Sequence, residues 1–244
     1  MRTPALLSLL LCLLAPATGS AADAVPAQRV LVFSRTEQFR HDSIPTAVAT
    51  LQALATGEGM LADHSEDADD VSPANLARYR VVVFASTTGD ILDAGQQAAL
   101  EGFIRAGGGF VGVHAAADTE YQWPWYGQLV GAYFKAHPPG LQDTRVQPER
   151  DGRAHGKAWA IRDELYNYRD NPRPRVQVVA TVDERLYQGG TMGADHPITW
   201  CHAFDGGRSW YTGLGHEEAV YRDPDFLAQL RQGLRYAAGR SARC

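Results

Sequence analysis

Short apolar runs alternate with amphipathic stretches along the first half of the chain. Runs rich in Val and Phe, without polar alternation, occupy residues 29–34, 79–86 and 109–114, which is typical of strands covered on both faces. Apolar side chains recur along one face at 43–55 and 92–109, which predicts helices. Single helices between strands indicate parallel pairing with right-handed crossovers, and hence a doubly wound α/β fold with a mostly parallel sheet.

Local signals mark where these two helices begin and end. Ser43 and Asp93 precede the helical stretches and are the expected N-caps, with Pro45 in the first turn of the first helix. Gly107 follows the second helix as its stop signal.

The second half of the chain has a less regular pattern. Strand-like pieces occur at 144–149, 176–182, 197–204 and 208–215, and a final helix is expected at 225–238. The segment "FDGGRSW" joins the last two strand-like pieces through Asp-Gly-Gly, which indicates a hairpin. We therefore expect antiparallel edge strands in the C-terminal half. No linker or repeat divides the chain, so residues 28–240 are read as a single domain.

The first 22 residues have the pattern of a secretory signal peptide. Arg2 is followed by an apolar run from Ala5 to Leu14, and Ser20 and Ala22 place small residues before an expected cleavage point after Ala22. Cys12 follows Leu11 rather than a small residue, which disfavours a lipid anchor. The rest of the chain has no run long enough to span a membrane. The sequence therefore predicts an exported protein, periplasmic or secreted.

The composition of the chain limits the classes of partner that it can bind. The net charge of the 244 residues is -5 and no basic run is present, which argues against nucleic acid because phosphate binding requires clustered Lys and Arg. Cys201 and Cys244 remain after removal of the signal peptide, and they could pair in an oxidising compartment. The sequence leaves that pairing and the oligomeric state open.

Candidate chemistry gathers where the predicted parallel strands end, because ligands bind outside the carboxyl ends of such strands. His114 ends the third strand at the tight turn "GVHAAAD", and Asp118 follows four residues later. Histidine carries protons or binds metals near neutral pH, and this spacing suits a His–Asp pair or a shared metal. The alternatives are a histidine that only hydrogen-bonds a loop and an aspartate that caps a helix.

Two further loops repeat this placement. "YTGLGHEE" puts His216 after a late strand and follows it with Glu217 and Glu218, which could orient the imidazole or merely cap a turn. "FRHDSI" puts Arg40 and His41 after the first strand, where the guanidinium could bind a carboxylate or a polyol.

Aromatic residues are dense just beyond His114. Trp123, Trp125 and Tyr126 suit the C–H faces of a sugar ring, although core packing also explains such residues. His137 ends this segment before two prolines, which fix its backbone direction. The segment "DELY", residues 163–166, contains two acids and a tyrosine that could belong to the site, although it could equally be a solvated turn. The remaining histidines of the second half are read as structural or surface residues: His155, His196 and His202.

Taken together, these stretches resemble the ThuA-like, or trehalose-utilisation, family. The resemblance covers about Arg29 to Ala238 and is carried by "FSRTEQFRHDSI", "GGGFVGVHAAADTEYQWPWYGQLVGAYFKAHPP", "DELY", "ATVDERLY" and "HPITWCHAFDGGRSWYTGLGHEEAVYRDPDFLAQLRQGLRYA". It implies a flavodoxin-like sheet related to class I glutamine amidotransferases. In those relatives a cysteine stands at the elbow where this chain has His114, while His216 and Glu218 match the later His-x-Glu. Without a thiolate, glutamine hydrolysis through a thioester is excluded.

The resemblance also implies a role in the use of disaccharides and oxidised keto-sugars. The leading hypothesis is an exported hydrolase or lyase acting on a disaccharide, a glycoside or its keto derivative, a small carbohydrate being its partner. The alternatives are a noncatalytic sugar-binding module of the same fold and a zinc hydrolase of another small molecule.

The candidate residues divide by role. The catalytic candidates are His114, His216, Glu218 and Asp118, and the substrate-binding candidates are Arg40, His41, Trp123, Trp125, Tyr126 and His137. A divalent metal would fall to His114, His216 and Asp118. Zinc fits such nitrogen and oxygen donors, but the sequence does not establish a cofactor.

Overall fold

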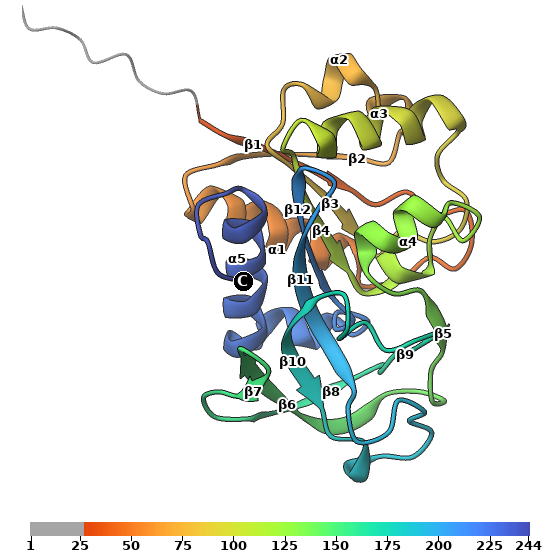
Figure 1. Cartoon of the computed structure of the whole chain (residues 1–244), viewed down its shortest axis with the longest axis vertical. Helices are drawn as coiled ribbons and strands as arrows, with labels where there is room; N and C mark the ends of the chain where they lie inside the picture. The colour runs from red at the N-terminus through yellow and green to blue at the C-terminus, as the bar shows by residue number, and fades with distance from the viewer. Residues whose placement is uncertain (1–26) are drawn as a thin grey trace, which may run out of the picture.

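The centre of the molecule is a mixed sheet whose parallel half carries the candidate histidines. The computed structural model describes residues 27–244, so the signal peptide expected at residues 1–22 lies outside the described residues. The strand order is β2-β1-β3-β4-β12-β11-β10-β6-β7, with β8 paired to β6 (Figure 1). The parallel strands are β1 Arg29–Phe33, β2 Leu61–Ser65, β3 Val81–Ala85, β4 Gly109–Val113 and β12 Gly207–Thr212.

Antiparallel strands extend the sheet beyond β12, as the sequence predicts. They are β11 Pro197–Phe204, β10 Gln177–Val182, β6 Gln142–Arg150, β7 Arg153–Ala154 and β8 Trp159–Asp163. The hairpin between β11 and β12 turns at Asp205 and Gly206, both with positive φ, as a two-residue hairpin turn requires. A separate two-stranded sheet pairs β5 Phe134–Ala136 with β9 Asn167–Tyr168.

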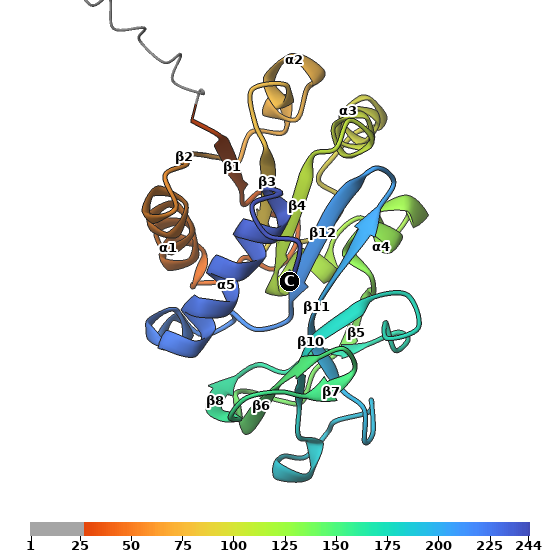
Figure 2. The same ribbon diagram turned by 60° about the vertical axis from the view of Figure 1, so that its left-hand side comes forward.

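Helices cover both faces of the sheet, which confirms the doubly wound α/β architecture. Figures 1 and 2 show α1 Ile44–Gly57 and α5 Pro224–Ala237 on one face, and α3 Ala94–Arg105 and α4 Pro124–Val130 on the other, with α2 Pro73–Leu76 beside α3. Four short 3-10 turns are also present in the described residues: η1 Ala68–Asp70, η2 His114–Asp118, η3 Glu184–Leu186 and η4 Glu218–Arg222.

The sequence did not predict the edge strand β2. Its residues, "LADHS", are mostly polar and only partly buried, so they lack the apolar run that marks β1, β3 and β4. Pairing with β1 along its full length stabilises this strand, because an edge strand needs only one partner and one covered face.

Of the two expected N-caps, the structure confirms one and contradicts the other. Asp93 caps α3 as predicted, accepting from Gln96 N while the Gln96 side chain accepts from Asp93 N in a capping box. Ser43 was expected to cap α1, but that prediction is wrong. Its hydroxyl makes no cap bond and instead donates to Gly215 O at 3.0 Å. It thereby ties the start of α1 to the loop after β12.

The two cysteines that remain after residue 27 form a disulfide. Cys201 in β11 and Cys244, the last residue, have Cα atoms 6.3 Å apart, within the range of ordinary disulfides. The bond fixes the C-terminus to the sheet.

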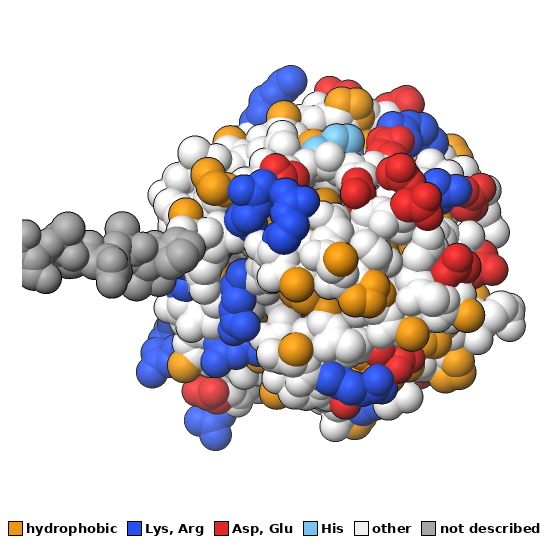
Figure 3. Space-filling view, turned by 90° about the horizontal axis from the view of Figure 1, so that it is seen from above, with side chains coloured by type: hydrophobic (Ala, Val, Ile, Leu, Met, Phe, Trp, Pro, Cys, Tyr) orange, Lys and Arg blue, Asp and Glu red, His pale blue; other side chains and the backbone are white. Residues whose placement is uncertain are grey.

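The outer surface carries both signs of charge. Seen from above (Figure 3), Lys and Arg side chains and Asp and Glu side chains share one face, with hydrophobic side chains scattered between them. Among the described residues, no helix combines the length and the apolar content that crossing a bilayer requires.

Close packing of β4 against α5 gives a test of the fold. A Cβ on Gly109 would overlap the carbonyl oxygen of Ala237, whereas a Cβ on Gly102, in the exposed face of α3, would meet nothing within 4 Å. We expect Gly109→Ala to lower the free energy of unfolding by about 2 kcal/mol or more, because backbone must move. Gly102→Ala should raise it by about 0.5–1 kcal/mol. Urea denaturation of the two variants measures both, and equal effects would contradict this packing.

Candidate functional site

Three histidines from separate loops meet at the carboxyl edge of the parallel strands. His41 lies in the loop after β1, His114 comes directly after β4, and His216 lies in the loop after β12. Their ring centroids are 4.8 Å apart for His41 and His114, 5.1 Å for His41 and His216, and 5.3 Å for His114 and His216. Parallel pairing explains this meeting, because it brings the ends of β1, β4 and β12 to one side of the sheet.

A buried carboxylate, Glu164, completes the group. Its Oε2 lies 3.5 Å from His114 Nε2 and 3.3 Å from His216 Nδ1, and its Oε1 lies 3.1 Å from His137 Nδ1. One possible ligand atom from each of His41, His114, Glu164 and His216 lies within 4.8 Å of the others. We call these four residues the histidine–glutamate cluster.

The backbone presents His114 to the cluster in an uncommon conformation. Its φ is 50°, in the left-handed region, which costs about 1–2 kcal/mol for a residue other than glycine. Its Nδ1 lies 2.8 Å from Gly213 O. Because a carbonyl only accepts, Nδ1 carries the hydrogen, and in the neutral ring Nε2 keeps its lone pair. That lone pair faces Glu164.

Three ring nitrogens in the cluster have no hydrogen-bond partner although they are buried. They are His41 Nδ1, His114 Nε2 and His216 Nδ1. The contacts of His114 and His216 with Glu164 are close enough for charge interaction but do not have hydrogen-bond geometry. Buried polar atoms are usually paired in proteins, so the convergence of three unpaired ring nitrogens makes this cluster a candidate ligand site.

The charges in the cluster depend on one another. Burial, together with the neighbouring His114 and His216, lowers the pKa of His41 to about 3, so this ring is neutral at physiological pH. Burial alone would raise the pKa of Glu164, but the nearby His114 and His216 imidazoles outweigh it and hold that pKa well below its usual range. In return, Glu164 raises the pKa of His216. The cluster thus combines an ionised carboxylate with imidazoles of unequal basicity.

Asp163, next to Glu164, holds the loop that carries His216. It is fully buried, and its two carboxylate oxygens accept from Gly215 N at 2.7 Å and Glu217 N at 2.9 Å. Tyr221 also donates to Gly215 O, at 3.1 Å. Burial raises the pKa of Asp163. The adjacent acids therefore differ in task, since Asp163 positions the loop and Glu164 contacts the imidazoles.

Aromatic side chains surround the cluster, but most are not those expected from the sequence. The Tyr166 ring lies 4.3 Å from the His114 ring, and Phe134 lies 4.2 Å from Tyr166. Phe39 packs edge-on against His41 at 4.8 Å and is 63% exposed. His137, which was expected to bind substrate, lies beside Glu164.

The structure places the other acidic candidates outside the cluster. Asp118 accepts from Tyr121 OH at 2.6 Å, and burial raises its pKa. It is not among the residues whose donor atoms converge, since η2 continues as a 3-10 turn rather than the expected helix after His114. Glu218 is exposed in the first turn of η4. Glu164 occupies the position at the imidazoles that was expected for these two carboxylates.

Most of the predicted substrate-binding residues also lie elsewhere. Arg40 makes two hydrogen bonds to Glu66, at 3.1 and 2.7 Å. Trp123 donates to Glu101, and Trp125 donates to Asp205 in the β11–β12 turn, at the amino end of β12. Tyr126 is fully buried, and its hydroxyl donates to Ala116 O. The Trp123 ring stacks on the rings of Trp125 and Tyr126 at the start of α4, so the structure does not bring these three rings to the histidines.

Comparison with known families supports the fold and the motifs. The family model ThuA, described as trehalose utilisation, matches residues 29–237. The chain belongs to the ThuA family. Comparison with curated proteins gave no match.

Solved structures of ThuA-like proteins share the architecture. A ThuA-like protein from Bacteroides uniformis superposes with a TM-score of 0.71 at 21% identity, over 90% of this chain and 95% of that one. One from Parabacteroides merdae has a TM-score of 0.71 at 17% identity, over 87% and 90%. A β-galactosidase from Rahnella sp. R3 matches at a TM-score of 0.54 and 16% identity, over 87% of this chain and 31% of that enzyme. At these identities the likeness concerns the fold alone.

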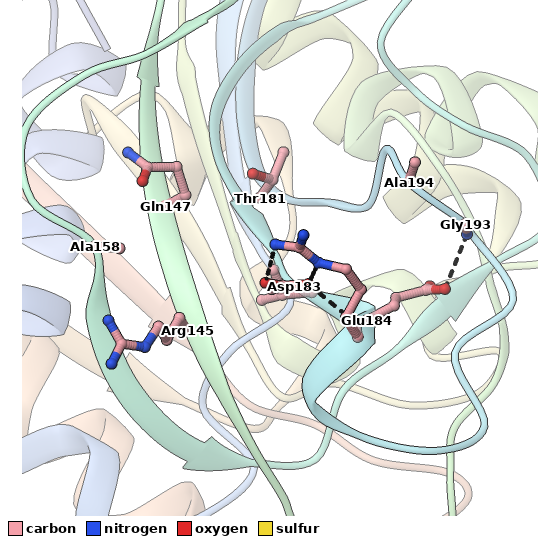
Figure 4. Close-up of a pocket in the computed structure, with 10 residues that line it drawn as sticks. Arg145, Gln147, Ala158, Thr181, Asp183, Glu184, Gly193 and Ala194 are labelled. Atoms are coloured by element: carbon pink, nitrogen blue, oxygen red, sulfur yellow. Dashed lines mark hydrogen bonds and ion pairs between the residues drawn. The ribbon is translucent and has the colours of Figure 1, made fainter.

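A cavity of about 780 Å³ in this ThuA-family chain is lined by none of the residues of the histidine–glutamate cluster. Arg145, Gln147, Thr181, Asp183, Glu184 and Arg185 are among the residues that line it (Figure 4). Asp183 pairs with Arg185, and Glu184 accepts from Met192 N and Gly193 N. Its lining includes no aromatic ring and no histidine. The histidine–glutamate cluster, with its unpartnered nitrogens, is therefore the stronger candidate site.

The role of Asp163 can be measured through stability. Asp163→Ala would leave the buried backbone N–H of Gly215 and the partly buried N–H of Glu217 without acceptors, and we expect a loss of about 3 kcal/mol in the free energy of unfolding. Asp163→Asn keeps one acceptor oxygen and should lose about half as much. Asp143→Ala is the control, since Asp143 pairs with Arg162 at the exposed surface and should change stability by less than about 1 kcal/mol. Urea unfolding provides the values, and a neutral Asp163→Ala would contradict the assignment.

Proposed function

We propose that this member of the ThuA family is an enzyme of carbohydrate metabolism that acts on a disaccharide, a glycoside or its keto derivative. The observation that carries the proposal is the histidine–glutamate cluster at the carboxyl edge of the sheet, with buried nitrogens that have no partner. The description of the family as trehalose utilisation supports a carbohydrate substrate. The absence of a cysteine at His114 supports a chemistry other than amide hydrolysis.

The residues of the site suit acid–base cleavage of a keto-glycoside. A carbonyl at C3 of the sugar makes the C–H at C2 acidic, so a base can remove that proton while the glycosidic C–O bond at the adjacent anomeric carbon, C1, breaks. The electron pair of the C–H bond forms a C=C bond, and the departing oxygen takes a proton from an acid. Water added to the C=C bond afterwards would complete a net hydrolysis.

Two histidines at the exposed side of the cluster fit these roles. His137 Nδ1 faces Pro138 O and Glu164, both acceptors, so its Nε2 is the nitrogen that can take a proton. His216 has a raised pKa beside Glu164 and a side chain that is 26% exposed, so it can donate a proton to the departing oxygen. Glu164 orients both rings. The exposed Phe39 ring could pack against a sugar face.

Turnover of trehalose and of its 3-keto derivative tests this function. We expect His216→Ala to lower kcat/KM for the accepted substrate by about a hundredfold or more, because a general acid contributes that much. His155→Ala, which removes an exposed histidine outside the cluster, is the control and should be unchanged. Product is followed by chromatography. Tight binding of the sugars without product would favour a noncatalytic module, and full activity in His216→Ala would refute the assigned role.

We also propose that the protein is exported. The apolar segment near its N-terminus and the small residues before position 23 support this, as does the disulfide between Cys201 and Cys244, because disulfides persist in oxidising compartments.

If the protein is exported, its N-terminus should be cleaved and its two remaining cysteines should be joined in a disulfide. Protein recovered from the periplasm or the medium should begin at Asp23 by intact mass. Cys201 and Cys244 should react with an alkylating reagent only after reduction. Cys12 would be absent from the processed chain. An unprocessed chain with free thiols, found in the cytoplasm, would contradict the proposal.

A further inference from the structure

We propose that the histidine–glutamate cluster binds a divalent first-row transition metal ion through His41, His114, His216 and Glu164. The inference rests on the proposed function, since it gives that same site its metal. It names a different ligand set from the one expected from the sequence, because His41 and Glu164 are included and Asp118 is not.

The donor types favour a transition metal over magnesium or calcium. Three imidazoles and one carboxylate converge. Imidazole suits zinc, iron, nickel and copper, whereas magnesium and calcium prefer all-oxygen sites. Of the four side chains, His41, His114 and Glu164 are buried, so water is largely excluded from one side of the site.

The orientation of His114 is that of a metal ligand. Its Nδ1 donates to the backbone carbonyl of Gly213, and metal-binding histidines generally donate their other nitrogen in this way, which fixes the tautomer. The remaining lone pair on Nε2 then faces the Glu164 oxygen at 3.5 Å. Two acceptors facing each other repel, and a cation between them converts that repulsion into two attractive contacts.

The unpartnered nitrogens supply an independent observation. His41 Nδ1 and His114 Nε2 are buried without a hydrogen-bond partner, and the two residues are 4% and 0% exposed. A core histidine of purely structural use satisfies its nitrogens, as His196 does with Tyr187 and Tyr166 O. Unlike His196, the cluster offers unpartnered buried nitrogens to a cation.

The size of the cluster is close to that of a loaded site. Ligand atoms around a tetrahedral zinc lie about 3.4 Å from one another, given bonds of about 2.0–2.2 Å. The four donor atoms here are separated by at most 4.8 Å, so each must move inward by less than about 1 Å. Side-chain rotation in the loops that carry His41 and His216 can provide this movement.

The other side of the cluster leaves room for a reactant. His216 is partly exposed, and His137 stands beyond Glu164 without being one of the four converging residues. Five- or six-coordinate geometry would leave positions for water or for substrate oxygens on that side. A metal there would polarise a carbonyl of a keto-sugar. Because His216 would then be a ligand, the proton would be moved by His137, which is not one of the four converging residues.

Metal content and metal binding test this inference separately from turnover. Protein exported to the periplasm and purified without a polyhistidine tag should contain about one equivalent of a transition metal by elemental analysis. After treatment with a chelator it should bind about one Zn²⁺ by calorimetry, with a rise in Tm. Glu164→Gln, which keeps the shape of the side chain, should bind Zn²⁺ about tenfold to a hundredfold more weakly. His114→Ala should lose binding, and His155→Ala should bind as wild type does.

The outcomes distinguish this inference from the proposed function. Stoichiometric Zn²⁺ binding that requires His114 and Glu164 supports the metal site even if no sugar is turned over, which would overturn the proposed function alone. The metal site would be overturned if the metal-free wild-type protein bound no Zn²⁺. It would also be overturned if Glu164→Gln, with an unchanged circular dichroism spectrum, bound Zn²⁺ as tightly as the wild type. Undiminished turnover after metal removal would overturn a catalytic role for the metal while leaving the acid–base function in place.

Discussion

The site depends on the burial of one carboxylate, Glu164, among three imidazoles. A charge removed from water is unfavourable unless partners compensate for it. Glu164 finds these partners in His216 and, at the surface, in His137, whose Nδ1 atoms lie 3.3 and 3.1 Å from its oxygens. Without the carboxylate, three imidazoles at this spacing would have only one another as neighbours. With it, they form a polar group that can hold a proton or a cation in the interior of the fold.

The sequence predicted those parts of the site that follow from parallel strands. His41, His114 and His216 each come after an apolar run. The alternation of strands and helices along the chain was enough to predict that they lie at the carboxyl edge of the parallel strands. Glu164 follows β8, which pairs antiparallel with β6 at the far side of the sheet. No local pattern indicates that this edge strand returns its end to the histidines. The stretch "DELY" was noted as two acids and a tyrosine, but its burial arises from tertiary contacts that a single sequence does not encode locally.

The aromatic residues illustrate the opposite difficulty. Trp123, Trp125 and Tyr126 are close to His114 in sequence, and density of aromatic residues alone favoured a sugar site. In the structure α4 turns them away, toward α3, the β11–β12 turn and the core. Tyr166, which contacts His114, comes from the segment before β9, and Phe134, which packs against Tyr166, comes from β5; the sequence did not reveal the pairing of β5 with β9. The fold class could be predicted from periodicity, whereas the orientation of individual side chains could not.

The loop after β12 is restrained from several directions. Asp163 accepts from two of its backbone N–H groups, and Ser43 and Tyr221 both donate to Gly215 O. A loop tied in this way cannot swing aside as a lid without breaking buried hydrogen bonds. Reactants must therefore arrive and depart past fixed side chains, and selectivity would come from the positions of these side chains rather than from closure of the loop around the reactant.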